Sequence, residues 1–139
     1  MSGSARYLLD TNVLSETRKR QANAGVLSFL SAQDSESLYV GVMTMGELRK
    51  GVEMKRKTDP NAAQRLAEWV DGLEHMHAGR IVPVDSAIAR LWGELSLDRP
   101  RPVVDTLLAA TALVHQLTLV TRDTSDLTGI PVKLLDPWQ

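Results

Sequence analysis

Hydrophobic and polar positions follow two alternating patterns along the chain. Short apolar runs rich in strand-forming residues are each followed by a longer segment in which apolar residues recur at helical spacing. The short runs predict strands at residues 7–9, 38–42, 81–84, 117–121 and 132–135. The longer segments predict a first helix ending near residues 16–18 and further helices at 24–31, 44–54, after Pro60, 87–97 and 105–115.

Two of these helical segments differ in how their apolar residues are distributed. After Pro60, which suits the first turn of a helix, the apolar residues form one stripe made of Ala62, Leu66, Trp69, Val70 and Leu73. This spacing predicts an amphipathic helix with one buried face. Residues 105–115 are apolar nearly all round, so this helix is expected to be buried.

Strands that alternate with helices predict an α/β fold with a largely parallel sheet covered on both faces, that is, a three-layer domain. Pro83 indicates that the third strand lies at an edge or ends there. With 139 residues and no linker or repeat, we expect residues 1–139 to form a single domain. Ligands of such sheets lie beyond the carboxyl ends of the strands.

Composition narrows the possible chemistry. The absence of cysteine removes disulfides, thiolate catalysis and cysteine–zinc sites. A formal net charge of −1 provides no global attraction to nucleic acid, so any such contact needs a local basic patch or metal ions. No apolar segment suits a signal peptide or a membrane span, and we expect a cytoplasmic protein.

Acidic residues follow several of the predicted strands or begin helices. Asp10 follows the first strand, Glu47 lies early in the helix after the second, and Asp105 begins the buried helix. Asp123 and Asp126 follow the fourth strand. If they share one edge of the sheet, their mutual repulsion requires protons or a cation to neutralise them. Carboxylate oxygens without histidine or cysteine select Mg²⁺ or Mn²⁺ over zinc.

Each acid also has a purely structural interpretation. Asp10, Asp105 and Asp85 could cap the helices that they precede, each contributing about 1 kcal/mol. The segment from Thr44 to Glu47 fits a capping box, in which the glutamate reaches back to the threonine amide. The three histidines at 75, 77 and 115 offer no catalytic pattern, and Trp69 and Trp92 lie on apolar stripes typical of core residues.

Four segments in order resemble one known family. They are LLDTNVLSE at 8–16, GELRKG at 46–51, VDTLLAATA at 104–112 and LVTRDTSDL at 119–127. Together they resemble the PIN-domain ribonucleases, most closely the VapC toxins of bacterial toxin–antitoxin pairs and their FitB-like branch. The resemblance covers nearly the whole chain.

The resemblance implies an α/β/α domain with a parallel sheet of about five strands and Mg²⁺- or Mn²⁺-dependent cleavage of RNA by a metal-activated water. Matched by motif position, Asp10, Glu47, Asp105 and Asp123 are the metal-binding and catalytic residues, with Asp126 close enough to replace Asp123. Asn12 is expected to hold the cluster by hydrogen bonds, and Thr121 matches a hydroxyl position near it.

The same resemblance implies a homodimer that serves as the toxin of a type II toxin–antitoxin system. The resemblance also implies that a cognate antitoxin inhibits this protein and that the protein contacts operator DNA only through the antitoxin. We expect a basic rim around the site formed by Arg18, Lys19, Arg20, Arg49 and Lys50.

Two rival functional classes remain. A haloacid-dehalogenase-like phosphatase needs a second aspartate where this chain has Asn12, and a catalytically degenerate PIN module would only bind partners.

Overall fold

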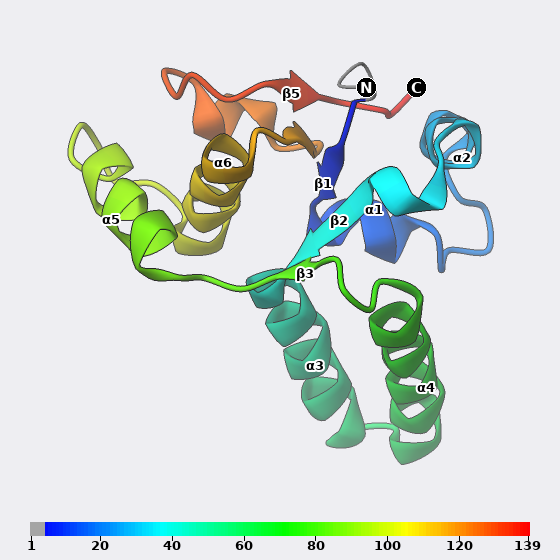
Figure 1. Cartoon of the computed structure of the whole chain (residues 1–139). Helices are drawn as coiled ribbons and strands as arrows, with labels where there is room; N and C mark the ends of the chain where they lie inside the picture. Colours follow the sequence, from blue (N-terminus) through cyan, green and yellow to red (C-terminus); the bar gives the residue numbers. More distant parts are fainter. Residues whose placement is uncertain (1–4) are drawn as a thin grey trace.

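The five apolar runs form the strands of one parallel sheet in the computed structural model, which describes residues 5–139 (Figure 1). The strands are β1 (Tyr7–Leu9), β2 (Leu38–Gly41), β3 (Ile81–Val82), β4 (Thr118–Val120) and β5 (Leu134–Leu135), in the order β3-β2-β1-β4-β5. Residues 1–4, part of the segment in which no signal peptide was expected, lie outside the described residues.

Helices connect the strands. They are α1 (Thr11–Glu16), α2 (Ala24–Ala32), α3 (Val42–Arg56), α4 (Pro60–Met76), α5 (Ser86–Leu95) and α6 (Val103–His115). Two short 3-10 helices, Ser35–Ser37 and Thr124–Leu127, were not predicted from the sequence. No helix within residues 5–139 has both the length and the apolar character needed to cross a bilayer.

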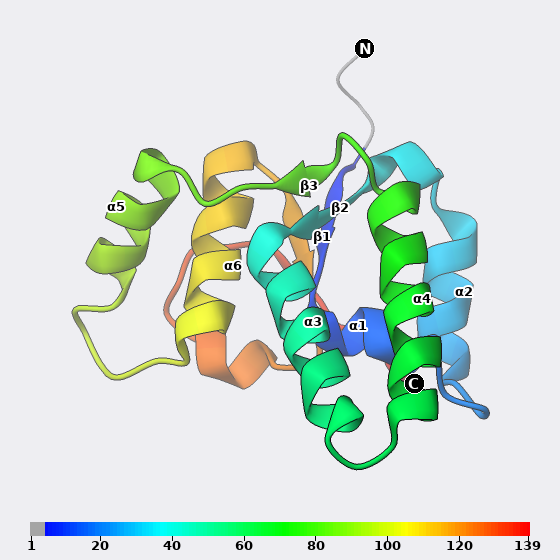
Figure 2. The ribbon, with the colours of Figure 1, turned by 90° about the horizontal axis from the view of Figure 1, so that it is seen from below.

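Alternate residues of each strand pack on opposite faces of the sheet, as the period of two in a strand requires. Leu9, Val40 and Val120 form one core with residues of α1, α2, α3 and α4. Leu8 and Leu119 point to the other face and pack against α6, while α5 extends that layer beside β3. Figure 2 shows the two helical layers separated by the sheet. The expected three-layer α/β/α fold is confirmed.

The helix α6 is buried as its all-round apolar pattern predicts. Leu108, Ala109, Ala110 and Ala112 are each at most 2% exposed. Burying such side chains is the main favourable contribution to folding. The helix lies against the sheet and α5, and this position fixes its first turn beside the carboxyl ends of β1 and β4 (Figure 1).

Several predicted boundaries were wrong by one or two residues. Residues 38–42 were expected to be a strand and 44–54 a helix, but β2 ends at Gly41 and α3 begins at once at Val42. The buried helix begins at Val103 rather than at Asp105. The third strand ends at Val82, directly before Pro83, which cannot donate a hydrogen bond to a neighbouring strand.

Candidate metal centre

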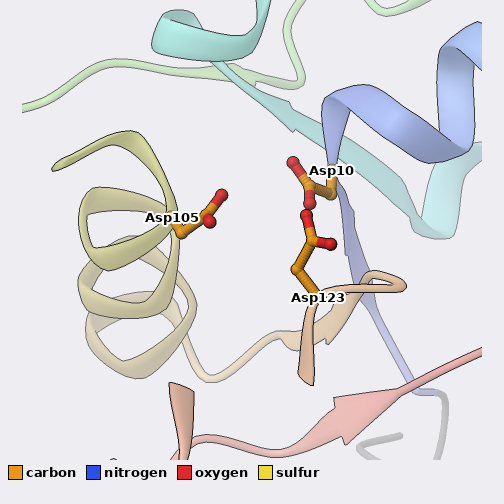
Figure 3. Close-up of side chains that lie close together, drawn as sticks. All are labelled: Asp10, Asp105 and Asp123. Carbon is orange, nitrogen blue, oxygen red and sulfur yellow. The ribbon is translucent and has the colours of Figure 1, made fainter. Parts of the chain in front are cut away.

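Three carboxylates from three separate elements converge at the carboxyl edge of the sheet (Figure 3). Asp10 follows β1, Asp123 follows β4, and Asp105 lies in the first turn of α6. One oxygen atom of each carboxylate lies within 4.8 Å of the corresponding atoms of the other two. β1 and β4 are neighbours, and the chain winds outward from them in opposite directions. Open parallel sheets bind ligands at such a reversal of strand order.

Asp10 is the buried member of the cluster, with 4% of its surface exposed. Its Oδ1 accepts a hydrogen bond from the backbone N–H of Thr11 at 2.6 Å, and its Oδ2 accepts one from the Thr121 hydroxyl at 2.7 Å. Burial raises the pKa of Asp10 above its ordinary value, and the negative charges of Asp123 and Glu47 add to this, while the two hydrogen bonds oppose it. The side chain also caps α1, so its structural and candidate chemical roles coexist.

Asp123 is exposed, but hydrogen bonds connect it to Asn12 of α1 and to Thr121 directly after β4. Its Oδ2 accepts a hydrogen bond from Asn12 Nδ2 at 3.1 Å, and its backbone N–H donates to Thr121 Oγ1 at 3.0 Å. The Thr121 hydroxyl therefore bridges the strand end that carries Asp123 and the carboxylate of Asp10. The expected positions of Asn12 and Thr121 beside the cluster agree with these contacts.

Asp105 has a strongly raised pKa. Burial and then the negative charges of Asp10, Asp123, Asp126 and Glu47 raise its pKa to about 6. The first turn of a helix, where unpaired N–H groups gather, partly favours its negative charge. The cluster therefore binds a proton more readily than isolated carboxylates do. The same negative charges would stabilise a bound cation.

Glu47 lies beside the three aspartates without joining the close group. It accepts a hydrogen bond from the Thr11 hydroxyl and lines the same cavity of about 400 Å³ as Asp10, Asp105 and Asp123. Asp126 is exposed and lies outside the close group among the described residues. Its backbone carbonyl accepts a hydrogen bond from Arg101. Of Asp123 and Asp126, the geometry brings Asp123 to the cluster.

Two structural interpretations of these acids are wrong. The residue that caps α3 is Gly41, with no side-chain hydrogen bond, so Thr44 and Glu47 do not form a capping box. Thr44 is buried in the first turn, and its hydroxyl has no partner among the described residues. Asp105 does not cap α6, because the cap is Pro102. Asp85 caps α5 as expected, through a bond from the Ile88 N–H.

The expected basic rim is present only in part. Arg18 and Lys19 line a cavity that adjoins the carboxylates. Arg49 instead pairs with Asp71 and Glu74 of α4, a pairing that a local sequence pattern does not encode. Arg20 and Lys50 are exposed and do not line that cavity.

One histidine serves the fold away from the site, and one serine lies at the site. His77 is buried and its Nδ1 pairs with the Leu73 carbonyl, so it serves the fold, as expected of the histidines. Ser15 lines the carboxylate cavity and was missed from the sequence. Its position four residues after Thr11, on the same face of α1, was the signal available.

The donor set fits a hard divalent cation. The atoms that point into the cluster are carboxylate oxygens (Figure 3), which Mg²⁺ and Mn²⁺ prefer. Burial, and then the surrounding negative charges, raise the pKa values of Asp10 and Asp105, so keeping these acids ionised in the folded chain costs free energy. A cation held by Asp10, Asp105 and Asp123 would offset this cost.

Comparisons with known proteins agree with this arrangement. The chain is 33% identical to the toxin FitB of Neisseria gonorrhoeae, over 94% of this chain and 97% of that protein. It is 31% identical to the VapC ribonuclease Y4jK of Sinorhizobium fredii, over 95% and 97%. The crystal structure of FitAcB from Neisseria gonorrhoeae superposes with a TM-score of 0.87 at 32% identity, covering 96% of this chain and 99% of the other.

The family comparison covers the whole of the site. The PIN domain model matches residues 7–128, a range that contains β1, β4, α6 and all four candidate acids. Because the family model matches most of the chain and a relative of more than 30% identity covers nearly all of it, the chain belongs to the PIN-domain family.

Proposed function

We propose that this chain is a ribonuclease and the toxin of a bacterial type II toxin–antitoxin pair, and that it hydrolyses RNA phosphodiester bonds at the carboxylate cluster. The observation that carries the proposal is the convergence of Asp10, Asp105 and Asp123. The names of the relatives, a VapC ribonuclease and the toxin FitB, support the substrate and the biological role.

The residues that would hold Mg²⁺ or Mn²⁺ are Asp10, Asp105 and Asp123, with Glu47 as the fourth acid. A bound cation would supply charge neutralisation, an activated water and stabilisation of the leaving oxygen. The chain itself supplies precise placement of the acids. Thr121 and the Thr11 N–H fix Asp10, while the Thr11 hydroxyl fixes Glu47 and Asn12 fixes Asp123.

We expect the carboxylate cluster to repel the phosphates of RNA when no cation is present. Its negative charges lie close together at a partly buried edge, where charges interact more strongly than in bulk water. Metal binding and substrate binding should therefore be coupled, and RNA should bind more tightly with Mg²⁺ than in EDTA.

The partners follow from the same proposal. We expect a homodimer that is inhibited by a cognate antitoxin and that reaches operator DNA only through it. A guanidinium of the antitoxin placed near Asp10 would neutralise the cluster as a metal does. The antitoxin should then compete with Mn²⁺, and its affinity should fall as Mn²⁺ rises. An affinity that responds neither to Mn²⁺ nor to Asp10→Asn would place inhibition elsewhere.

Cleavage of RNA by the purified protein tests the proposed activity. We expect Mg²⁺ or Mn²⁺ to support cleavage, EDTA to stop it, and the products to carry 5′-phosphate and 3′-hydroxyl ends. Asp10→Asn and Asp105→Asn should leave a folded protein with most activity lost, because asparagine keeps the shape and loses the charge. Asp85→Asn is the matched control, since Asp85 follows β3 but lies outside the cluster among the described residues.

The same assay separates the rival classes. Full activity in EDTA, or in Asp10→Asn with Mg²⁺, would reject the carboxylate mechanism, and cyclic phosphate ends would reject water as the nucleophile. A degenerate PIN module would bind its partner but turn over no RNA. A phosphatase would release phosphate from small phosphomonoesters and leave RNA uncut.

A further inference from the structure

A second cavity opens directly beside the carboxylate cavity. It has a volume of about 400 Å³, within the range of about 300–1,000 Å³ typical of small-molecule sites. The two cavities share three lining residues, Thr11, Ser15 and Glu47. They are therefore parts of one continuous depression at the edge of the molecule where α1 and α3 meet.

The far wall of this second cavity is apolar and aromatic. Trp69 and Leu66 come from α4, and Leu48 comes from α3. Figure 2 shows α1, α3 and α4 close together on one side of the sheet. Trp69 packs against the hydrophobic core, as the sequence pattern predicted, but it is only partly buried and also borders the cavity.

Two cations stand at the rim of the same cavity. The guanidinium of Arg18 lies over the Trp69 ring, with its central carbon 5.4 Å from the ring centre. Lys19 pairs with Glu16 at 2.9 Å but keeps 59% of its side chain exposed. Both follow α1, whose first residues adjoin Asp10. Arg49, by contrast, is engaged by the acids of α4.

We propose that this cavity, lined by Trp69, Leu48 and Leu66 with Arg18 and Lys19 at its rim, is a base pocket. It binds one nucleobase of single-stranded RNA beside the phosphate that is cut. The base lies against the apolar wall and stacks with Trp69 and the Arg18 plane, as unpaired bases do on aromatic rings and guanidinium groups. Arg18 and Lys19 contact the neighbouring backbone phosphates. This inference rests on the proposed ribonuclease function and adds the recognition of an unpaired nucleotide.

The charge of the rim favours RNA as the occupant. Phosphates are attracted by Arg18 and Lys19. The pocket also continues into the carboxylate cavity, so a nucleotide bound in it leaves an adjacent phosphate close to Asp10. Recognition by stacking tolerates every base, and the pocket should therefore select unpaired RNA rather than one particular base.

The first test measures binding of a fluorescein-labelled, mixed-sequence single-stranded RNA in Mg²⁺, by anisotropy. Full-length Asp10→Asn is used as the non-cleaving form. Trp69→Leu keeps an apolar side chain but removes the ring, and should weaken binding about 10-fold or more. Trp69→Phe should restore part of the affinity. Trp92→Leu, a tryptophan of α5 outside the pocket, should bind as the parent does.

A second pair of variants tests the rim. Arg18→Gln should weaken binding several-fold and flatten the dependence of affinity on salt, because a phosphate contact is lost. Arg90→Gln removes an exposed arginine of α5 that does not line the pocket, and should change neither quantity. In a series of RNAs, one abasic nucleotide is placed at each position in turn. Binding to the parent should weaken when the abasic nucleotide lies at one position beside the cleaved bond. This loss should vanish in Trp69→Leu.

The outcomes separate this inference from the proposed function. If RNA is cleaved but Trp69→Leu and Arg18→Gln bind and cleave it as the parent does, the base pocket is rejected and the ribonuclease remains. If these variants weaken binding of the purified antitoxin and leave RNA binding unchanged, the cavity belongs to the protein partner and the inference is likewise wrong. If no RNA is cleaved under any metal condition, the proposed function itself fails.

Discussion

The three aspartates at the edge of the sheet differ in how many hydrogen bonds their carboxylates accept. Asp10 accepts two hydrogen bonds and Asp123 accepts one from Asn12. For Asp105 the structure provides no side-chain hydrogen bond among the described residues, and its carboxylate faces the charges of the other acids. Groups kept for chemistry often cost stability. Asp105 is where that cost should be measurable in this protein.

The first prediction is that Asp105→Asn stabilises the metal-free protein at pH 7.5. The pKa of Asp105 is raised to about 6 from an ordinary value of 3.8, which corresponds to about 3 kcal/mol. Solvent screening at this partly exposed site reduces the expected gain to about 1–2 kcal/mol. Urea unfolding in EDTA measures the free energy of unfolding. Asp34→Asn, a change at an exposed capping residue, should leave it within about 0.5 kcal/mol of the parent.

The pH dependence of this difference has a fixed sign. A folded pKa above the unfolded one means that the folded protein binds the extra proton between about pH 4 and pH 6. The contribution of Asp105 to stability is therefore present below pH 4 and is lost as the pH rises through 6. The advantage of Asp105→Asn should shrink as the pH falls from 7.5 to 5. An equal advantage at both pH values would argue against the raised pKa.

At the scale of elements, the carboxyl-terminal residues secure the beginning of α2. The Asn23 side chain caps α2 through the N–H groups of Gly25 and Val26, and it also bonds both to the carbonyl and to the N–H of Gln139. Trp138 packs beside the guanidinium of Arg122, 5.0 Å from the ring centre. Segments distant in sequence thus meet at one helix start.

The close approach at this helix start predicts a strong effect of one methyl group. A Cβ atom at Gly25 would overlap the backbone carbonyl oxygen of Pro137. We expect Gly25→Ala to lower the free energy of unfolding by about 1–3 kcal/mol, as overpacking does. The control is Gly72→Ala in α4, where a Cβ meets nothing within 4 Å and helix propensity should stabilise by about 0.5–1 kcal/mol. Equal effects of the two changes in urea unfolding would contradict this contact.

An element could be predicted from the sequence when the residues that determine it lie close together in the chain. The strands and the all-round apolar helix follow from periodicity, and the carboxyl-end rule for parallel sheets anticipated the meeting of Asp10 and Asp123. The start of α3 could not be predicted in this way. Glu47 is held by Thr11, 36 positions away, so the local capping-box pattern was misleading. Arg49 likewise pairs with acids more than 20 positions further along the chain.

At the scale of the whole molecule, the candidate metal centre joins the two sides of the sheet. Asp10 belongs to the segment that leads into α1, while Asp105 and Asp123 belong to α6 and the segment after β4. A cation bound to all three would connect both helical layers. Its binding energy would therefore add to the stability of the entire fold rather than to one loop.

Mn²⁺ should accordingly raise the melting temperature of the protein in a single cooperative transition, as expected of one domain. At 100 times the dissociation constant the gain is about 2.7 kcal/mol. Asp10→Asn and Asp105→Asn should show much smaller shifts, whereas Asp85→Asn should match the parent. Calorimetry with and without EDTA checks this. A shift of full size in Asp10→Asn would place the cation elsewhere, and two separate transitions would reject the single domain.

The pairing of β1 with β4 also sets the moment at which a newly made chain can complete its carboxylate cluster. The Thr121 hydroxyl that holds Asp10 comes 111 positions later in the chain, and β1 and β4 pair directly. A ribosome adds about 5–20 residues per second, so roughly 5–20 s of translation separate the synthesis of Asp10 from that of its partner. During this interval the nascent chain carries Asp10 without Asp123 and without the hydroxyl that holds Asp10 in place. Under the proposed function, the nuclease site can therefore be complete only when synthesis of the chain is nearly finished.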